Sequence, residues 1–268
     1  MNTNHYLEIG ADHKVCQDYA ASGFLYNVER GPTYYAVVCD GCSSAPHSEF
    51  GAQVITHCAI DSLKHNPYTI PEEFIQDVMK KAKEAVRHTG VDPRCLFATL
   101  LLVRADTDNT YVWMWGDGVY NITLKNGGYF IKEVHYAGNA PYYPYYAATP
   151  AQHGSYVRAF APSKEVRYDL NGCVGDETFN GTNAFEPTVA MIETEQIKSV
   201  TLMSDGVESY QDINKVSVPS DDIIREVTAF KTTTGHYVER RMLAFKQRLC
   251  VANQWSHYDD LSVAGISL

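Results

Sequence analysis

Asp-Gly pairs end three apolar runs of the 268-residue chain. The runs are 34-YYAVVCDGCSS-44, 111-YVWMWGDGVY-120 and 200-VTLMSDGVES-209. A hairpin turn is a sufficient explanation for Asp117-Gly118, which separates two strand-like segments. Asp40-Gly41 and Asp205-Gly206 do not join two obvious strands. Since an unpaired carboxylate withdrawn from water costs several kcal/mol, these aspartates need a partner.

Acidic residues stand in the same kind of place near both ends of the chain. Asp18 precedes an apolar stretch, and the adjacent Asp259 and Asp260 directly precede the last one, 261-LSVAGISL-268. If strands of two packed sheets bring such ends together, neighbouring carboxylates disfavour each other's charged form unless a cation intervenes. Oxygen ligands without a Cys/His cluster select Mg²⁺ or Mn²⁺ over zinc. Two such ions about 4 Å apart can deprotonate a shared water that attacks phosphorus in line.

The composition is that of a globular protein with a sizeable core, because 45% of the residues are hydrophobic and 20% are charged. No long hinge interrupts the chain, so we expect one domain over residues 1–268. The formal net charge of -10 argues against binding to nucleic acid or to an anionic membrane. The first residues lack a basic region followed by an apolar core, and no apolar run approaches the roughly 18 residues that span a bilayer. We therefore predict a cytoplasmic protein.

Seven cysteines in a chain without a secretory signal do not indicate a disulfide framework. Cys39 and Cys42 form a C-x-x-C, but no second pair with zinc-site spacing accompanies them. The favoured interpretation is therefore small buried or turn cysteines, and zinc binding or redox chemistry is the less favoured one.

β-Branched and aromatic residues predict seven strands. They are 34–39, 96–104, 110–115, 119–124, 129–134, 200–204 and 261–268. Asn126-Gly127-Gly128 predicts a tight turn, so the fourth and fifth strands should pair as an antiparallel hairpin. Apolar periodicity predicts four helices, with Ser48 as a cap of the first. They are 48–64, 72–88, 220–230 and 235–250. Two helix pairs around hairpin-like strands indicate an α+β layered domain.

The segment from about 138 to 190 differs from the rest of the chain. It includes 139-NAPYYPYYAATP-150 and 176-DETFNGTNAFEPT-187, which are rich in Tyr, Pro, Asn and Gly and show little periodicity. Such an excursion from a compact domain is either a lid beside a binding site or a decorated surface loop. As a lid, it would influence the choice of protein substrate without supplying metal ligands.

Six motifs, taken in order, resemble those of the metal-dependent Ser/Thr protein phosphatases of type 2C, especially their bacterial branch. They are 10-GADHKVCQDYA-20, 37-VVCDGCSSAPHSEFGAQ-53, 97-FATLLLV-103, 116-GDG-118, 204-SDGVES-209 and 257-HYDDLSVAGI-266. Together they span nearly the whole chain. The resemblance implies an α-β-β-α sandwich, in which two antiparallel sheets flanked by helix pairs hold metals in a cleft at one end.

The resemblance also implies a set of metal ligands. Asp40 would bridge two Mn²⁺ or Mg²⁺ ions, with the carbonyl of Gly41 on the second ion. Asp205 and Asp259 would hold the first ion, and Asp18 would act through metal-bound water. Gly41 would allow a sharp backbone turn that a Cβ would obstruct.

Other residues of the motifs have smaller expected roles. Asp117 stands in the family's Gly-Asp-Ser/Gly motif and, together with Asp205, would support a weaker third metal. Thr99 is expected to pack or to form a local hydrogen bond. Three histidines are expected to be ordinary, partly exposed or hydrogen-bonded residues outside the site. They are His47, His57 and His257.

Two positions depart from the pattern of the family. Many relatives carry an Arg as a phosphate ligand five residues before the acid of the first motif, and His13 stands there instead. Its neighbour Lys14 is the competing candidate for binding the phosphate. Cys42 follows Asp40-Gly41, where some relatives have a His proposed as general acid. The metal ligands therefore follow the family, while the phosphate contact and the leaving-group acid do not.

The carboxylates and the resemblance together predict hydrolysis of phosphoserine or phosphothreonine on proteins, by a water that bridges two ions. The predicted catalytic residues are Asp40, Asp18 and His13, and the predicted partners are a phosphorylated protein and a cognate Ser/Thr kinase or its target. Two alternatives stay open. One is a catalytically weak module that binds phosphoproteins, and the other is a metal-dependent hydrolase of small phosphoesters.

Overall fold

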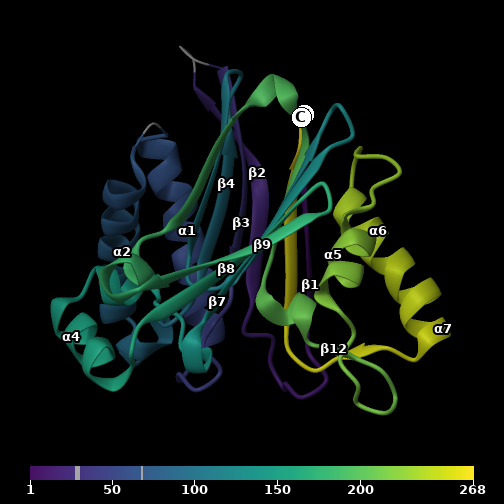
Figure 1. The fold of residues 1–268 in the computed structure, drawn as a ribbon. Helices are drawn as coiled ribbons and strands as arrows, with labels where there is room; N and C mark the ends of the chain where they lie inside the picture. The colour runs from purple at the N-terminus through teal and green to yellow at the C-terminus, as the bar shows by residue number, and fades with distance from the viewer. Residues whose placement is uncertain (28–30, 68) are drawn as a thin grey trace.

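The computed structural model describes residues 1–27, 31–67 and 69–268. Two antiparallel β-sheets pack face to face, and a pair of helices covers the outer face of each sheet (Figure 1). This arrangement confirms the predicted α-β-β-α sandwich. None of the described helices is long and apolar enough to cross a membrane.

The larger sheet has seven strands in the order β1-β14-β11-β6-β7-β8-β9. Their bounds are β1 Asn2–Glu8, β6 Gly118–Leu124, β7 Tyr129–Tyr136, β8 Ser163–Leu170, β9 Cys173–Asn180, β11 Ile197–Met203 and β14 Leu261–Ser267. The smaller sheet has five strands in the order β10-β5-β4-β3-β2. Their bounds are β2 Tyr19–Asn27, β3 Gly31–Cys39, β4 Leu100–Ala105, β5 Asn109–Trp115 and β10 Thr188–Glu193. The predicted hairpin is confirmed, because β6 and β7 pair antiparallel.

Two helix pairs sandwich the sheets. Helices α1 (Ser48–His65) and α2 (Pro71–Arg87) pack on the five-stranded sheet, and α5 (Ser220–Thr228) and α6 (Tyr237–Phe245) pack on the seven-stranded one. The remaining short elements are α3 Pro144–Ala147, α4 Pro150–Ala159, α7 Val251–Asn253, β12 Tyr210–Gln211, β13 Ser256–His257 and a π-helical turn Lys246–Cys250. Apolar side chains fill the space between the sheets and the space under each helix pair, so three layers of core hold the sandwich together.

The start of α1 differs from the sequence prediction. The residue that caps the helix is His47, which has left-handed backbone angles with φ of 56°, and Ser48 is the first helical residue. The Ser48 side chain is buried, and its Oγ accepts a hydrogen bond from Gln17 Nε2 at 2.9 Å. Ser48 therefore links α1 to the amino-terminal loop, and its predicted role as a cap is wrong.

The hairpin explanation of Asp117-Gly118 is also wrong. Strand β5 belongs to the five-stranded sheet and β6 to the seven-stranded sheet, so the intervening residues cross from one sheet to the other. Gly116 and Gly118 both have positive φ, at 90° and 127°, which L residues with a side chain rarely adopt. The two glycines allow this crossing, and Asp117 lies between the sheets as a result.

The segment 138–190 is more regular than its composition indicates. Strands β8 and β9 extend the seven-stranded sheet, and β10 pairs with β5 at the edge of the five-stranded sheet. Most side chains of β9 are exposed, so the strand has no buried face to leave a periodic apolar pattern. The expectation of an irregular excursion is wrong for β8 to β10, and a lid function stays a prediction for the residues before them.

Gly51→Ala is expected to lower the melting temperature by several degrees, because an added Cβ would clash with the carbonyl of Cys95. Neither the added Cβ nor the Cys95 carbonyl can move without moving the backbone. Overpacking of this kind lowers the free energy of unfolding by about 1–3 kcal/mol. Gly154→Ala is the matched control in another helix, since the nearest atom there is the flexible end of Arg158 at 3.4 Å. There, the better helix propensity of Ala should leave stability unchanged or raise it. Equal melting temperatures for both variants would contradict the close packing of α1.

Candidate active site

Four of the predicted aspartates line one cavity of about 360 Å³. Each one comes from the end of a central strand. Asp40 follows β3, Asp117 lies between β5 and β6, Asp205 follows β11, and Asp259 stands two residues before β14. Because β3 and β5 belong to one sheet and β6, β11 and β14 to the other, the carboxylates meet where the two sheets open at one end. Gly41 lines the same cavity.

The carboxylates in this cavity repel one another. The pKa of Asp40 is raised well above its usual range, first by withdrawal from water and then by the charges of Asp18 and Asp205. Burial, followed by the charge of Asp205, likewise raises the pKa of Asp117. Such a donor set, made of oxygens that cannot all stay ionised alone, fits a hard divalent cation.

Asp18 is not among the described residues that line the cavity. Only 4% of the residue is exposed, and no described residue forms a hydrogen bond of good geometry with either carboxylate oxygen. Burial is the largest cause of its raised pKa, which the Ser204 and Ser262 hydroxyls oppose and the charge of Asp205 increases. A buried carboxylate is costly unless it is well hydrogen-bonded, so a metal-bound water would stabilise Asp18 further.

Gly41 is required by close packing and not by an unusual turn. Its φ is not in the positive range, but an added Cβ would lie 2.7 Å from Gln17 O and 2.8 Å from Ser48 O. Thr99 supports the neighbouring residue, because its Oγ1 accepts a hydrogen bond from Asp40 N at 3.0 Å. This contact agrees with the local hydrogen bond expected for Thr99.

Asp260 organises the amino-terminal loop. Its carboxylate accepts hydrogen bonds from Gly10 N at 2.8 Å and from Gln17 N at 2.6 Å, and its side chain is 1% exposed. The Nδ1 atom of His13 lies 2.8 Å from the same carboxylate. Residues 10–17 are thereby held against the start of β14. The resemblance singled out Asp259 as a metal ligand, but nothing in the sequence indicated the role of Asp260.

His13 lies between two carboxylates at the edge of the cavity. Its Nε2 is 3.5 Å from Asp259 Oδ1, and its Nδ1 faces Asp260. Burial lowers the pKa of His13, but the hydrogen bond and charge of Asp260 and the charges of Asp259 and Asp18 outweigh it, and the pKa is raised. Lys14 is exposed and is not among the described residues that line the cavity.

The first residues of the Tyr/Pro-rich segment form one wall of the cavity. Gly138, Asn139, Pro141 and Tyr143 line it, and Tyr143 lies near Cys42. Burial, and then the nearby Cys42 and Asp117, raise the pKa of the Tyr143 hydroxyl, which keeps it protonated as a donor. The part of the segment that reaches the site is therefore short.

The histidines expected outside the site lie outside it. His47, His57 and His257 are not among the described residues that line the cavity. The side chain of His47 is 66% exposed, and His257 pairs with Glu8 at 3.2 Å.

A second polar group lies close to Asp205 and was missed in the sequence. One ligand atom from each of Glu133, His135 and Glu208 lies within 4.8 Å of the others. Glu133 already accepts hydrogen bonds from Arg167 Nη1 at 3.2 Å and from a serine hydroxyl, so we assign no ion to this group. Burial, followed by the charges of Asp205 and Glu133, raises the pKa of Glu208 to about 9. The available signals were Glu208 in the motif after Asp205 and the alternation of Glu133 and His135 along β7.

An α-β-β-α sandwich with carboxylates of both sheets gathered at one end defines a metal-dependent hydrolase. The family model described as Protein phosphatase 2C matches residues 10–244, and the chain therefore belongs to this family. It is a protein phosphatase of type 2C, and therefore a hydrolase. No curated protein matches the chain.

Solved structures of bacterial phosphatases share the fold. The serine/threonine phosphatase Stp1 from Staphylococcus aureus is 14% identical with a TM-score of 0.56, and the alignment covers 100% of this chain and 94% of that one. The S. agalactiae serine/threonine phosphatase is 13% identical with a TM-score of 0.54, covering 100% and 99%. The phosphatase domain of SpoIIE from Bacillus subtilis, solved with a fragment of its regulatory domain, is 15% identical with a TM-score of 0.56, covering 99% and 62%. At these identities the likeness supports the fold alone.

Proposed function

We propose that the chain hydrolyses phosphoserine and phosphothreonine on proteins with two divalent ions, Mn²⁺ or Mg²⁺, in the carboxylate cavity. The observation that carries the proposal is the meeting of Asp40, Asp205 and Asp259 from both sheets in one cavity. Asp40 and the Gly41 carbonyl would serve the second ion, and Asp40, Asp205 and Asp259 the first. When bound, such ions make water a nucleophile at neutral pH and neutralise charge on phosphoryl oxygens.

The remaining residues of the site would position the substrate and the water. Asp18, a buried carboxylate whose charge acts on Asp40, would orient a water, and Asp117 with Asp205 would support a weaker third ion. Tyr143 and Cys42 form the wall that a phosphorylated loop would meet, so the short stretch 138–143 carries the predicted lid role. A kinase that acts on the same substrate and a cytoplasmic location both stay predictions.

Metal removal tests this function directly. Hydrolysis of a phosphothreonine peptide is expected to stop in EDTA and to return with Mn²⁺ or Mg²⁺, because the proposed nucleophile is a water that the ions activate. The peptide should also have a higher kcat/KM than any nucleotide in a panel of nucleoside mono- and triphosphates. Full turnover of the metal-free enzyme would refute the ion-dependent mechanism, and a preference for nucleotides would favour the small-phosphoester alternative.

His13→Ala is expected to raise the KM for a phosphopeptide by about tenfold, the effect of losing one charge-assisted hydrogen bond. A protonated His13 offers Nε2 at the cavity edge, where relatives use Arg. His47→Ala is the control, since that side chain is 66% exposed and outside the cavity. Steady-state kinetics on both variants give the answer. An unchanged KM in His13→Ala would leave phosphate binding to the ions or to Lys14.

A further inference from the structure

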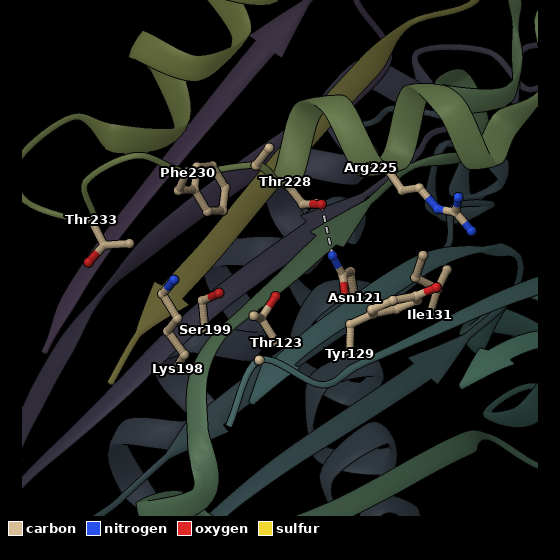
Figure 2. A pocket seen from close by; sticks show the side chains of 12 residues that line it. Asn121, Thr123, Tyr129, Ile131, Lys198, Ser199, Arg225, Thr228, Phe230 and Thr233 are labelled. Carbon is tan, nitrogen blue, oxygen red and sulfur yellow. Dashed lines mark hydrogen bonds between the residues drawn. The ribbon is translucent and has the colours of Figure 1, made fainter. Parts of the chain in front are cut away.

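The outer face of the seven-stranded sheet changes from apolar to polar along its length. Near the active site, Val119 and Met203 are buried in the core under α5 and α6. Farther along the same two strands and on the same face, Asn121 and Ser199 are buried polar residues. A pocket of about 250 Å³ lies above them, between the sheet and α5 (Figure 2). Buried polar groups are costly unless they have hydrogen-bond partners, so this part of the sheet is unlike a packing surface.

Asn121 presents a buried acceptor that lacks a donor. Its Nδ2 donates to Thr228 Oγ1 at 2.8 Å, and that hydroxyl donates its own proton to Ile224 O at 2.7 Å. The Thr228 hydroxyl can therefore only accept from Asn121, and this fixes the orientation of the carboxamide. No described residue donates to Asn121 Oδ1, although only 5% of Asn121 is exposed. The pocket thus favours a ligand with an N–H or O–H group.

The rest of this first pocket suits a ring with polar substituents. Tyr129, Ile131 and Phe230 provide aromatic and aliphatic surface, and three hydroxyl-bearing residues also line the pocket (Figure 2). The three are Thr123, Ser199 and Thr233. Apolar walls with a few convergent polar groups are typical of small-molecule sites.

A second pocket, of about 260 Å³, shares one lining residue, Phe230, with the first. It is strongly cationic. Its charged residues are Lys231, Arg240, Arg241 and Arg248. Arg241 and Arg248 are seven residues apart, about two turns, so they share one face of the helical segment that starts with α6, and Arg240 lies beside that face.

The four cations are not equally free. Arg241 Nη2 pairs with Glu226 Oε2 at 2.6 Å, and Arg240 Nη2 donates to Thr234 O at 2.7 Å, so both hold the walls of the pocket. Lys231 and Arg248 are exposed, and no described acidic side chain pairs with either. Two cations are therefore available to an anionic ligand.

The charged residues that line these two pockets are all positive. Twelve described residues line the first pocket and eight line the second, with one in common. Six of them are Lys or Arg and none is Asp or Glu, in a chain that has 22 of the former and 32 of the latter. Glu226 and Asp169 neutralise Arg241 and Arg225 from outside the lining. On so acidic a protein, a pocket lining with excess cations and no acid still favours anions.

We propose that the two pockets form one binding site for a nucleoside polyphosphate, with the base and ribose in the first pocket and the phosphates in the second. The unpaired Asn121 Oδ1 would accept a hydrogen bond from an N–H of the base. Lys231 and Arg248 would contact the phosphates. The first pocket lies at the end of β6 and β11 that is remote from Asp117 and Asp205, so this site is separate from the phosphatase cavity.

Calorimetric titration in EDTA tests the site independently of catalysis, because the phosphatase cavity then holds no metal. ATP and GTP are the probes, and tripolyphosphate is the comparison without a base. At least one nucleotide is expected to bind ten times or more as tightly as tripolyphosphate. Lys231→Ala and Arg248→Ala should each lower the affinity for that nucleotide by about tenfold, the effect of one lost charged contact. Asn121→Leu should remove the advantage of the nucleotide over tripolyphosphate.

Matched variants separate this site from general anion binding. Lys80→Ala removes one exposed charge from α2 on the opposite helix layer, and Asp40→Asn alters only the phosphatase cavity. Neither should change nucleotide binding. Tripolyphosphate binding as tightly as the nucleotides, an acidic peptide binding here while nucleotides do not, or nucleotide affinity unaffected by Lys231→Ala and Arg248→Ala would each overturn the proposal. Lys231→Ala and Arg248→Ala change exposed side chains, so these two variants remain informative if Asn121→Leu fails to fold.

Discussion

Asp40→Asn is expected to lower kcat on a phosphothreonine peptide by on the order of 10³-fold, since ligand loss removes several kcal/mol of metal-derived stabilisation. Asp40 is the only aspartate proposed to serve both ions, and it lies against Asp205. Titration with Mn²⁺ should show that both tight sites are lost or weakened. Asp117→Ala is the control, because it is expected to retain the two tight sites and to lose only the weaker third one.

The same substitution should have the opposite effect on stability. Without metal, Asp40 is a partly buried carboxylate beside Asp18 and Asp205, and its raised pKa means that its charge destabilises the fold. In EDTA, Asp40→Asn should therefore melt at a higher temperature than the unmodified protein. With Mn²⁺ the order should reverse, because only the unmodified protein gains stability from bound ions. If Asp40→Asn melted at a lower temperature than the unmodified protein in EDTA, the repulsion between carboxylates inferred for this cavity would be wrong.

Asp260→Ala should destabilise the fold by about 3–5 kcal/mol, the cost of removing one partner from a buried charged network. Three groups would lose their acceptor, namely Gly10 N, Gln17 N and His13 Nδ1. The loop that carries His13 would then detach from β14, and metal affinity should fall as well. Chemical denaturation and Mn²⁺ titration measure the two effects.

The adjacent residue provides the control for this prediction. The Asp259 side chain is 41% exposed and lines the cavity, whereas that of Asp260 is 1% exposed. Asp259→Ala should abolish tight binding of one ion and leave the stability of the metal-free protein nearly unchanged. If both variants lost the same free energy of unfolding, the distinction between ligand and organiser would be wrong.

Local patterns in the sequence were sufficient for much of the fold. The apolar face of 72–88, with acids at its start, predicted α2, and Asn126-Gly127-Gly128 predicted the turn between β6 and β7. These features depend on residues a few positions apart, whose periodicity and turn preferences act within one element. The order of the acidic motifs likewise indicated the family and the residues gathered in the cavity.

The polar edge strands were not predictable in this way. β1, β8 and β9 lie at or near the edges of the larger sheet, and most residues of β9 face solvent. A strand without a buried face needs no apolar alternation, so its composition resembles that of a loop. Its pairing partner, which lies in another element, is what makes it a strand.

The tertiary structure was needed to show which aspartates are buried and which face the cavity. By its local pattern alone, Asp117-Gly118 resembles a hairpin turn, but β5 and β6 belong to different sheets. The family resemblance assigned a metal to Asp259 and no role to the adjacent Asp260. Asp260 is buried with Gly10 and Gln17, whereas Asp259 turns into the cavity. The chemical type of a residue is set by the sequence, but its burial and its partners come from segments that are distant along the chain. These long-range contacts set the pKa and the available lone pairs of a carboxylate, and with them its role.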